Sequence, residues 1–329
     1  MRSGLFISFA LILLIPIAVS AQDAIGDAEA FNASVNPQYP APYSQASLSL
    51  LSSTLDLNNA TMAVSVAGKE IYQGSVRPIA IQMGKAGNVI SVKVTVTSAG
   101  ASYSQTLSVQ PQDVVIIAEP ISSSPPLYPG KSLVPLEGDV RVVAVANLQG
   151  AKGQIIDPAA LSYSWTVDET QIASASGIGK QSIIVASPLQ YRSRSVSVAI
   201  VSQDGGLVGG SSLSLTALDP SVRLYKNDSL LGILYDHALY GSYAINNAED
   251  TLYAAPFSLP TTNGMPLLQW FLNGASAQTG NAITLRPTGK GAGTASLSLT
   301  ASSGGSTLAT ENLSLSFGAA KNGLGLFGL

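Results

Sequence analysis

Cysteine is absent from the 329 residues of the chain. This absence excludes disulfide bonds, thiol redox chemistry and metal centres held by cysteine. Each folded domain must therefore draw its stability from a hydrophobic core, and a domain of about 100 residues is large enough to form one.

Charged residues are also scarce, at 11% of the chain, whereas about 25% is usual for soluble domains. The 16 basic and 19 acidic residues are scattered, and no basic stripe is present. Because nucleic-acid binding relies on clustered Lys and Arg, we expect no nucleic-acid partner. Ser, Thr, Asn and Gln supply most of the polar positions instead.

The single histidine of the chain is His237. A Ser–His–Asp triad would need this residue as its base, and no G-x-S-x-G motif accompanies it. We therefore predict that the protein is not an enzyme. We expect His237 to be a partly exposed loop residue between strands, or a pH-sensitive contact at a domain joint.

Cofactor and metal motifs are equally weak. Gly179-Lys180 lacks the glycine spacing of a phosphate-binding loop, and Gln181 stands where such a loop has Ser or Thr. Calcium at a domain joint is the weaker alternative, because it needs six to eight oxygen ligands and the acidic residues are dispersed. The prediction is therefore no cofactor and no metal. The acids weighed for calcium are Asp113, Asp219, Glu137, Asp139, Asp168, Glu169, Glu249 and Asp250.

The N-terminus has the pattern of an export signal. Arg2 precedes an apolar stretch over residues 5–19, and small residues end it at Ala21. We predict a signal peptide over residues 1–21 and a short linker over 22–30. The stretch is shorter than the roughly 20 residues of a spanning helix, so an uncleaved signal is the one membrane contact we consider. The expected location is the cell surface, the periplasm or the medium.

One strand pattern occurs three times, at intervals of about 100 residues, which is the size of one β-sandwich domain. Its central residue is Val64 in the first copy, Trp165 in the second and Trp270 in the third, and each is a predicted core residue. Apolar residues alternate with Ser, Thr and Ala in the flanking segments, which indicates strands with one buried face. A turn segment precedes the last strand of each unit, at residues 98–100, 203–206 and 302–305.

The sequence therefore predicts an all-β chain of three tandem antiparallel sandwiches. We place them at residues 31–111, 112–219 and 220–317, followed by a Gly-rich apolar tail over 318–329. The links at 110–113 and 218–221 each contain proline, which restricts the backbone, so we expect stiff joints. Tyr43, Tyr128 and Tyr235 recur near the start of the units. We expect each ring to be half-buried with its hydroxyl on the backbone; a ligand site is the alternative.

The strand W-x-[VL]-[ND]-x, the opening Asn36-Pro37-x-x-Pro40 and the glycine turn before the last strand resemble bacterial PKD-like and immunoglobulin-like modules. Residues 163–180 are similar to a segment of exported Ig-like proteins of Patescibacteria-type candidate-phylum bacteria. The resemblance covers residues 31–317 and implies the fold and a surface location, with no catalytic residues to transfer. Val64 replaces the Trp of the other two units, and the cysteine pair of antibody-type domains is missing.

Tyr191, Arg192 and Arg194 form the one compact basic and aromatic cluster. This cluster and His237 are our candidate interaction residues. An anionic glycan or a neighbouring domain would be the partner, and a solvated strand entry is the alternative reading.

The function predicted from these features is a non-enzymatic exported protein of the cell envelope or surface, acting as a structural or adhesive multi-domain rod. The alternative is a stalk with one domain that binds a glycan or a secretion or pilus component. An exported hydrolase with an unfamiliar site is a third hypothesis. An envelope protein or a glycan is the expected partner.

Overall fold

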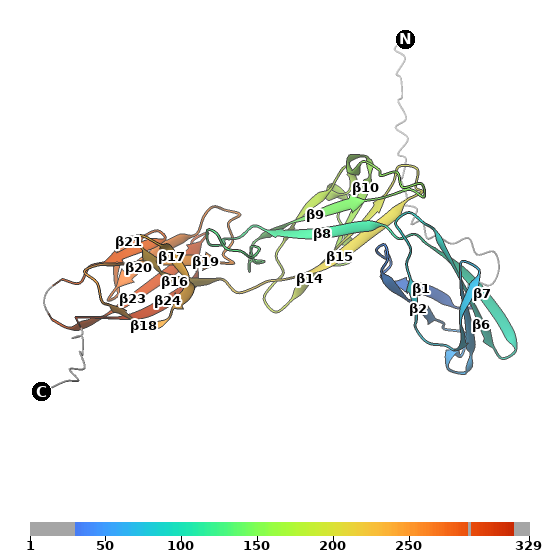
Figure 1. Cartoon of the computed structure of the whole chain (residues 1–329), viewed down its shortest axis with the longest axis horizontal. Helices are drawn as coiled ribbons and strands as arrows, with labels where there is room; N and C mark the ends of the chain where they lie inside the picture. The colour runs from blue at the N-terminus through green and yellow to red at the C-terminus, as the bar shows by residue number, and fades with distance from the viewer. Residues whose placement is uncertain (1–29, 289–290, 319–329) are drawn as a thin grey trace, which may run out of the picture. The chain divides into compact units, whose positions relative to one another are not determined.

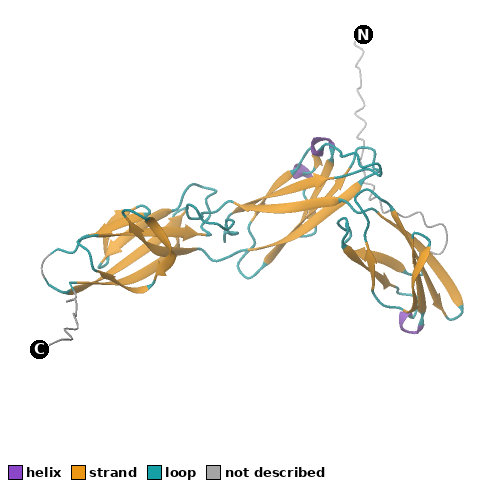
Figure 2. Cartoon of the chain, in the orientation of Figure 1, coloured by secondary structure: helices purple, strands orange, loops and turns teal. Residues whose placement is uncertain are grey.

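A computed structural model describes residues 30–288 and 291–318 of the chain. The predicted signal peptide and all but the first residue of the predicted tail lie outside this part. The described residues form β-strands joined by loops and three 3₁₀ helices, η1 (Leu57–Asn59), η2 (Pro158–Ala160) and η3 (Ala173–Ala175) (Figure 2). No helix among them is long and apolar enough to cross a membrane.

The chain divides into two compact units. One consists of the residues up to Gln112 together with Gly150–Gln154, and the other of Asp113–Gln149 with the residues from Ile155 onward. The first unit contains one two-sheet sandwich and the second contains two, labelled by strand in Figure 1.

The first sandwich pairs a three-stranded sheet, order β1-β2-β5, with a four-stranded sheet, order β4-β3-β6-β7. All of its strand pairs are antiparallel. The strands are β1 (Asn32–Asn36), β2 (Gln45–Leu51), β3 (Thr61–Val66), β4 (Lys69–Ser75), β5 (Ile79–Gln82), β6 (Ile90–Ser98) and β7 (Ala101–Val109).

The second sandwich repeats this plan with sheets of order β13-β9-β8 and β11-β10-β14-β15, and β12 adds to β10. Its strands are β8 (Asp113–Pro120), β9 (Asp139–Asn147), β10 (Ser162–Val167), β11 (Thr170–Gln171), β12 (Gly177–Ile178), β13 (Ser182–Ala186), β14 (Ser193–Val201) and β15 (Val208–Thr216).

The third sandwich keeps the same core and adds a strand to each sheet, which gives the orders β17-β16-β19-β22 and β18-β24-β23-β20-β21. The added strands are β17 and β18, and β18 runs parallel to β24. The strands are β16 (Ser221–Asp228), β17 (Gly232–Leu239), β18 (Gly241–Ile245), β19 (Asp250–Phe257), β20 (Leu267–Leu272), β21 (Ala275–Thr279), β22 (Ala282–Leu285), β23 (Gly293–Ser303) and β24 (Ser306–Phe317).

The three sandwiches share one pairing scheme, in which three strands form one sheet and four strands that include the last hairpin form the other. This is the two-sheet arrangement of immunoglobulin-like domains. The predicted fold class of three tandem β-sandwiches is confirmed. The boundaries assigned at residues 111 and 219 stay a prediction.

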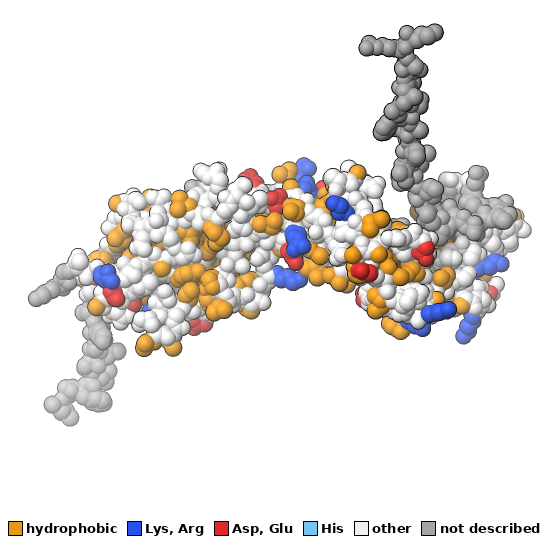
Figure 3. All heavy atoms as spheres, turned by 90° about the horizontal axis from the view of Figure 1, so that it is seen from above, with side chains coloured by type: hydrophobic (Ala, Val, Ile, Leu, Met, Phe, Trp, Pro, Cys, Tyr) orange, Lys and Arg blue, Asp and Glu red, His pale blue; other side chains and the backbone are white. Residues whose placement is uncertain are grey.

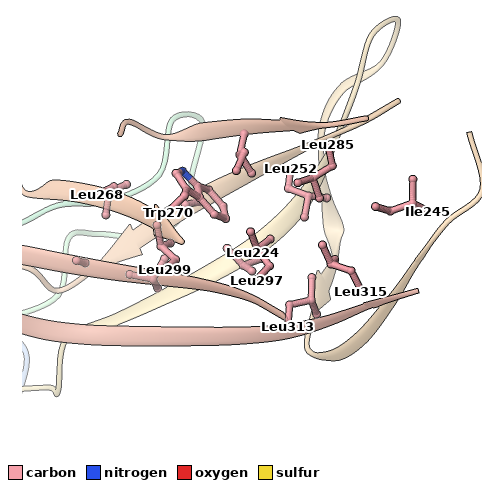
Figure 4. Close-up of a cluster of buried hydrophobic side chains, with 14 of the residues drawn as sticks. Leu224, Ile245, Leu252, Leu268, Trp270, Leu285, Leu297, Leu299, Leu313 and Leu315 are labelled. Carbon is pink, nitrogen blue, oxygen red and sulfur yellow. The ribbon is translucent and has the colours of Figure 1, made fainter. Parts of the chain in front are cut away.

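A separate core fills each sandwich, because apolar residues alternate along the strands and point between the two sheets. In the third sandwich Trp270 lies between the sheets, surrounded by leucines from both of them (Figure 4). Burial of this kind contributes about 25 cal/mol for each Å² of apolar surface removed from water, so it supplies most of the stability of a cysteine-free domain.

Two features of the fold differ from the sequence prediction. The first strands of the second and third sandwiches, β8 and β16, were not predicted, and the segment around His237, which was expected to be a loop, forms β17 and is followed by β18. In β8 the run Val114-Val115-Ile116-Ile117 has no alternation of apolar and polar residues, so it carries no period-two signal.

Candidate interaction surfaces

The three repeated core residues occupy equivalent strands. Val64 lies in β3, Trp165 in β10 and Trp270 in β20, and each side chain is fully buried. Each indole N–H donates a 2.8 Å hydrogen bond, from Trp165 to the carbonyl of Lys180 and from Trp270 to the carbonyl of Gly280. These residues therefore stabilise the sandwiches and offer no surface for a ligand.

The basic and aromatic cluster lies at the start of β14, and its three side chains, those of Tyr191, Arg192 and Arg194, differ in their contacts. The Arg194 side chain is held by Asp168, at 3.0 Å between Nε and Oδ2, and by the carbonyl of Ala186 at 2.7 Å. Tyr191 is 93% exposed, and Arg192 is also exposed. Only Tyr191 and Arg192 present free side chains to a partner.

His237 lies in a strand, so the prediction of a loop position is wrong. Along the pair of β16 and β17, Tyr225 faces Ala238 and Asn227 faces Ile233, which leaves residues 234–237 bulged opposite Lys226. A bulge of this kind breaks the alternation by which a strand is recognised. The His237 side chain is exposed at the edge of the sheet.

The recurring tyrosines do not make the hydroxyl-to-backbone contacts that were expected of them. Tyr43 is 71% exposed, and Tyr128 packs edge-on against Phe257 with ring centroids 5.5 Å apart. Tyr235 packs against Tyr225 at 5.1 Å, and its pKa is raised by burial and then by Tyr253 and Tyr225. Within the described residues, none of the hydroxyls of Tyr43, Tyr128 and Tyr235 donates to the backbone, so that part of the expectation is wrong.

A charged cluster closes one end of the third sandwich. Asp250 is 4% exposed, and its Oδ1 lies 3.7 Å from Lys226 Nζ and accepts a 2.8 Å hydrogen bond from Asn247 Nδ2. Burial, then the charge of Asp250 and a hydrogen bond to it, raise the pKa of Tyr243 to about 12. A buried carboxylate without partners would lower the stability of the domain. The contacts of Asp250 therefore stabilise the packing of the strands around it.

Within the second compact unit, the second and third sandwiches are joined by main-chain hydrogen bonds. The amide of Ser123 donates to the carbonyl of Leu259 at 2.8 Å, and the amide of Ser258 donates to the carbonyl of Ser123 at 3.2 Å. The amide of Thr261 donates to the carbonyl of Ile121 at 3.1 Å. The residues 121–123 and 258–261 thus pair like two short strands across the joint. The proline link over 218–221 is only one part of this connection.

Ser258 lies at the centre of this joint with no solvent exposure. Its hydroxyl lies 3.1 Å from the carbonyl oxygen of Val134 and 3.0 Å from that of Leu218. The residue has a positive φ of 59°, a strained backbone for Ser that persists only where surrounding contacts hold it. The joint is therefore a packed and hydrogen-bonded element.

A cavity of about 460 Å³ lies beside the joint. Glu137 and Asp139 line it from one side and Thr262 and Asn263 from the other, with no basic residue in the lining. Neither carboxylate takes part in an ion pair within the described part of the chain. The described part of the chain contains no group of three or more His, Asp or Glu side chains placed to hold a metal ion.

No protein-family model and no curated protein sequence matches the chain. Among solved structures, the three N-terminal domains of the highly immunogenic outer capsid protein Hoc of bacteriophage RB49 are 14% identical to it, with a TM-score of 0.24, over 88% of this chain and 99% of that one. The central fibronectin-III array of RIM-binding protein is 8% identical, with a TM-score of 0.30, over 87% and 95%.

A glycan-bound structure is also among the similar ones. The Bacteroides ovatus protein SGBP-B, solved in complex with a mixed-linkage heptasaccharide, is 11% identical to the chain, with a TM-score of 0.21, over 89% of this chain and 72% of that one. These likenesses are distant and assign no activity or partner. The chain is a tandem array of three immunoglobulin-like β-sandwich domains.

Proposed function

We propose that the protein is a non-enzymatic, exported component of the cell envelope or surface, in which tandem sandwiches act as a structural or adhesive spacer. The pattern of residues 1–21 supports export, and the three independent cores support a modular extracellular role. The weakly charged, hydroxyl-rich composition agrees with a protein that works in contact with water and polymers outside the cell.

The observation that carries the proposal is the joint between the second and third sandwiches. A flexible carrier would connect its domains through Gly and Ser linkers, whose ends move independently. Here the two sandwiches are connected by main-chain hydrogen bonds and by the buried Ser258. Such a joint keeps the distance between two points on successive domains fixed, which is what a spacer requires.

The experiment is localisation in cells that produce the protein. Intact cells are labelled with an antibody against residues 221–317, and cell fractions and medium are probed in parallel. We expect labelling of intact cells, with the protein retained in the envelope fraction. Cytoplasmic protein would refute export, and protein found only in the medium would refute a role as an envelope spacer.

A recognition domain carried on a stalk is the second candidate function. The exposed Tyr191 and Arg192 favour it, because an aromatic ring and a guanidinium side by side are frequent contact residues. Replacing both with Ser should release the protein from its partner in the envelope fraction while leaving its unfolding midpoint unchanged. Retention of that double variant in the envelope would exclude this contact.

A further inference from the structure

Each sandwich exposes rows of paired hydroxyl side chains. In the first sandwich the rows lie on the final hairpin, β6 and β7, where residues on one strand directly face residues on the other. Thr95 and Ser104 lie 3.0 Å apart between their hydroxyl oxygens, and Thr97 and Ser102 lie 2.9 Å apart. A third pair joins Ser91 to Ser108.

The second and third sandwiches repeat this arrangement on their own final hairpins. The register places Ser or Thr opposite Ser or Thr at three positions in the second hairpin, and at three positions before the bulge at Ala301 and Ser302 in the third. The pairs are Ser193 with Thr216, Ser195 with Ser214 and Ser197 with Ser212 in the second sandwich, and Thr294 with Ser316, Ser296 with Ser314 and Thr300 with Thr310 in the third.

These hydroxyls lie on the outer side of the sheet. The residues between them, such as Val94, Val198 and Leu299, are buried in the three cores, and successive side chains of a strand point to opposite faces. All of the paired Ser and Thr residues are exposed or partly exposed. We refer to the outer side of each final hairpin as a hydroxyl face.

The spacing of a sheet makes each hydroxyl face a regular grid. Neighbouring strands lie about 4.8 Å apart, and residues i and i+2 lie roughly 6.6 Å apart along a strand. Every hydroxyl can donate one hydrogen bond and accept two. A flat polymer that carries many hydroxyl groups can therefore exchange hydrogen bonds with several positions of the grid at once.

Charge and hydrophobicity select against other partners. Lys93, which faces Thr106, is the one charged residue at the outward paired positions, because Arg194 and Glu311 lie opposite the buried Leu215 and Leu299, so the faces attract neither polyanions nor polycations strongly. Charged side chains are also few and scattered on the molecular face in Figure 3. Apart from Val201 and Val208, at the turn end of the second hairpin, the outward paired positions contain no large apolar side chain, whereas a lipid surface would need several.

We propose that the three hydroxyl faces bind a neutral polysaccharide. This inference rests on the adhesive form of the proposed function and names its partner. A hydroxyl on the protein exchanges one hydrogen bond with water for one with the sugar, so each contact is weak. Three faces in one chain compensate for this weakness, because linked sites raise the overall affinity without any new type of contact.

The test is co-sedimentation of the chain lacking residues 1–21 with insoluble neutral polysaccharides, namely cellulose, chitin, starch granules and yeast mannan. We expect binding to at least one of them, and retention of that binding at high salt because no ion pairs are involved. Loss of binding in high salt would contradict the proposal. Absence of binding to all four would overturn it.

The variant that tests the faces replaces one exposed serine in each: Ser104→Ala, Ser214→Ala and Ser314→Ala. The matched control replaces three exposed serines outside the faces, one in each sandwich: Ser53→Ala, Ser174→Ala and Ser229→Ala. We expect a stepwise, several-fold loss of bound protein as one, two and three faces are altered, and full binding by the control. Both triple variants should unfold at the same denaturant concentration as the parent, since the positions are exposed.

Equal binding by the face variant and the parent would show that another surface holds the polymer, and would overturn the inference. This result is separate from the localisation experiment. If the protein lies on the cell surface and binds none of the four polysaccharides, the spacer function stands and only the polysaccharide partner is refuted. A cytoplasmic location would refute the proposed function, whichever polysaccharide the purified protein binds.

Discussion

Asn273 and Ser296 exchange two hydrogen bonds across the sheet of the third sandwich. The amide of Asn273 donates to the carbonyl of Ser296 at 2.8 Å, and the amide of Ser296 donates to Oδ1 of Asn273 at 2.8 Å. Asp168 and Ser195 make the equivalent pair in the second sandwich, at 3.0 and 2.9 Å. In the first sandwich Ala67 donates to the Ser91 carbonyl but has no side-chain acceptor to offer.

Asn273→Ala should destabilise the third sandwich by about 1–2 kcal/mol. The substitution removes the acceptor for the amide of Ser296 and places Ala at a φ of 48°, where Asn is better tolerated. Equilibrium unfolding in urea measures the change. An unchanged free energy of unfolding would show that water replaces the amide oxygen without cost.

Ala67→Asn should stabilise the first sandwich by about 0.5–1 kcal/mol. Ala67 has a φ of 50°, and Asn both tolerates this backbone and supplies the missing acceptor toward Ser91. The free energy of unfolding is measured as before, and Ala63→Asn on the adjacent strand serves as the control. A lower stability of the Ala67 variant would contradict the equivalence of the three turns.

Trp165→Phe should cost the second sandwich roughly 1–3 kcal/mol, because it removes the indole donor to the Lys180 carbonyl and leaves space in a fully buried site. Tyr240→Phe, at a position 77% exposed, is the control and should change little. Near-UV circular dichroism and urea unfolding report the effect. Equal stability of the two variants would argue against a structural role for the indole.

Ser258→Ala should loosen the joint between the second and third sandwiches. Its hydroxyl is the one that contacts the carbonyls of Val134 and Leu218, and their loss should cost about 1–3 kcal/mol locally. We expect faster hydrogen exchange at the amides of Ser123, Leu259 and Thr261, with the cores unchanged. Ser242→Ala is the exposed control. Unaltered exchange at the three joint amides would exclude this role for Ser258.

The stability of the third sandwich should fall between pH 10 and about pH 12. Burial and Asp250 raise the pKa of Tyr243 to about 12, whereas an unfolded tyrosine titrates near 10. Between these values the unfolded chain has released a proton that the folded chain still holds, so rising pH favours unfolding, and below pH 10 the effect vanishes.

Tyr243→Phe should reduce this loss of stability, and Asp250→Asn should lower the pKa of Tyr243 in a phenolate absorbance titration. Tyr235, another tyrosine of the third sandwich with a raised pKa, leaves part of the slope in place. An identical pH dependence for Tyr243→Phe and the parent would contradict the assignment.

The repeat of Val64, Trp165 and Trp270 was readable from the sequence because strand residues alternate between core and solvent with a fixed period. The turns at residues 98–100, 203–206 and 302–305 were readable for a related reason, since glycine supplies backbone angles that other residues avoid. Local rules of this kind gave the fold class and the three final hairpins.

The candidate site residues were less predictable. Arg194 donates a hydrogen bond to Asp168, which lies 26 residues earlier in the chain, and no local sequence pattern predicts that contact. His237 was assigned to a loop because the bulge in β17 breaks the alternation on which the assignment depended. β18 was missed because it is short and pairs with β24, a strand about 70 residues later.

Sequence alone determined that this chain is all-β, free of cysteine and built from repeated sandwich cores, because composition and period act on neighbouring residues. Tertiary structure decided the joint, where Ser123 and Leu259 bond across 136 residues of chain. It also decided the hydroxyl faces, since only strand register brings Ser104 opposite Thr95. The joint depends on pairing between distant segments and the faces depend on the exact register within each hairpin. Composition fixes neither, because the backbone groups that pair are the same at almost every residue.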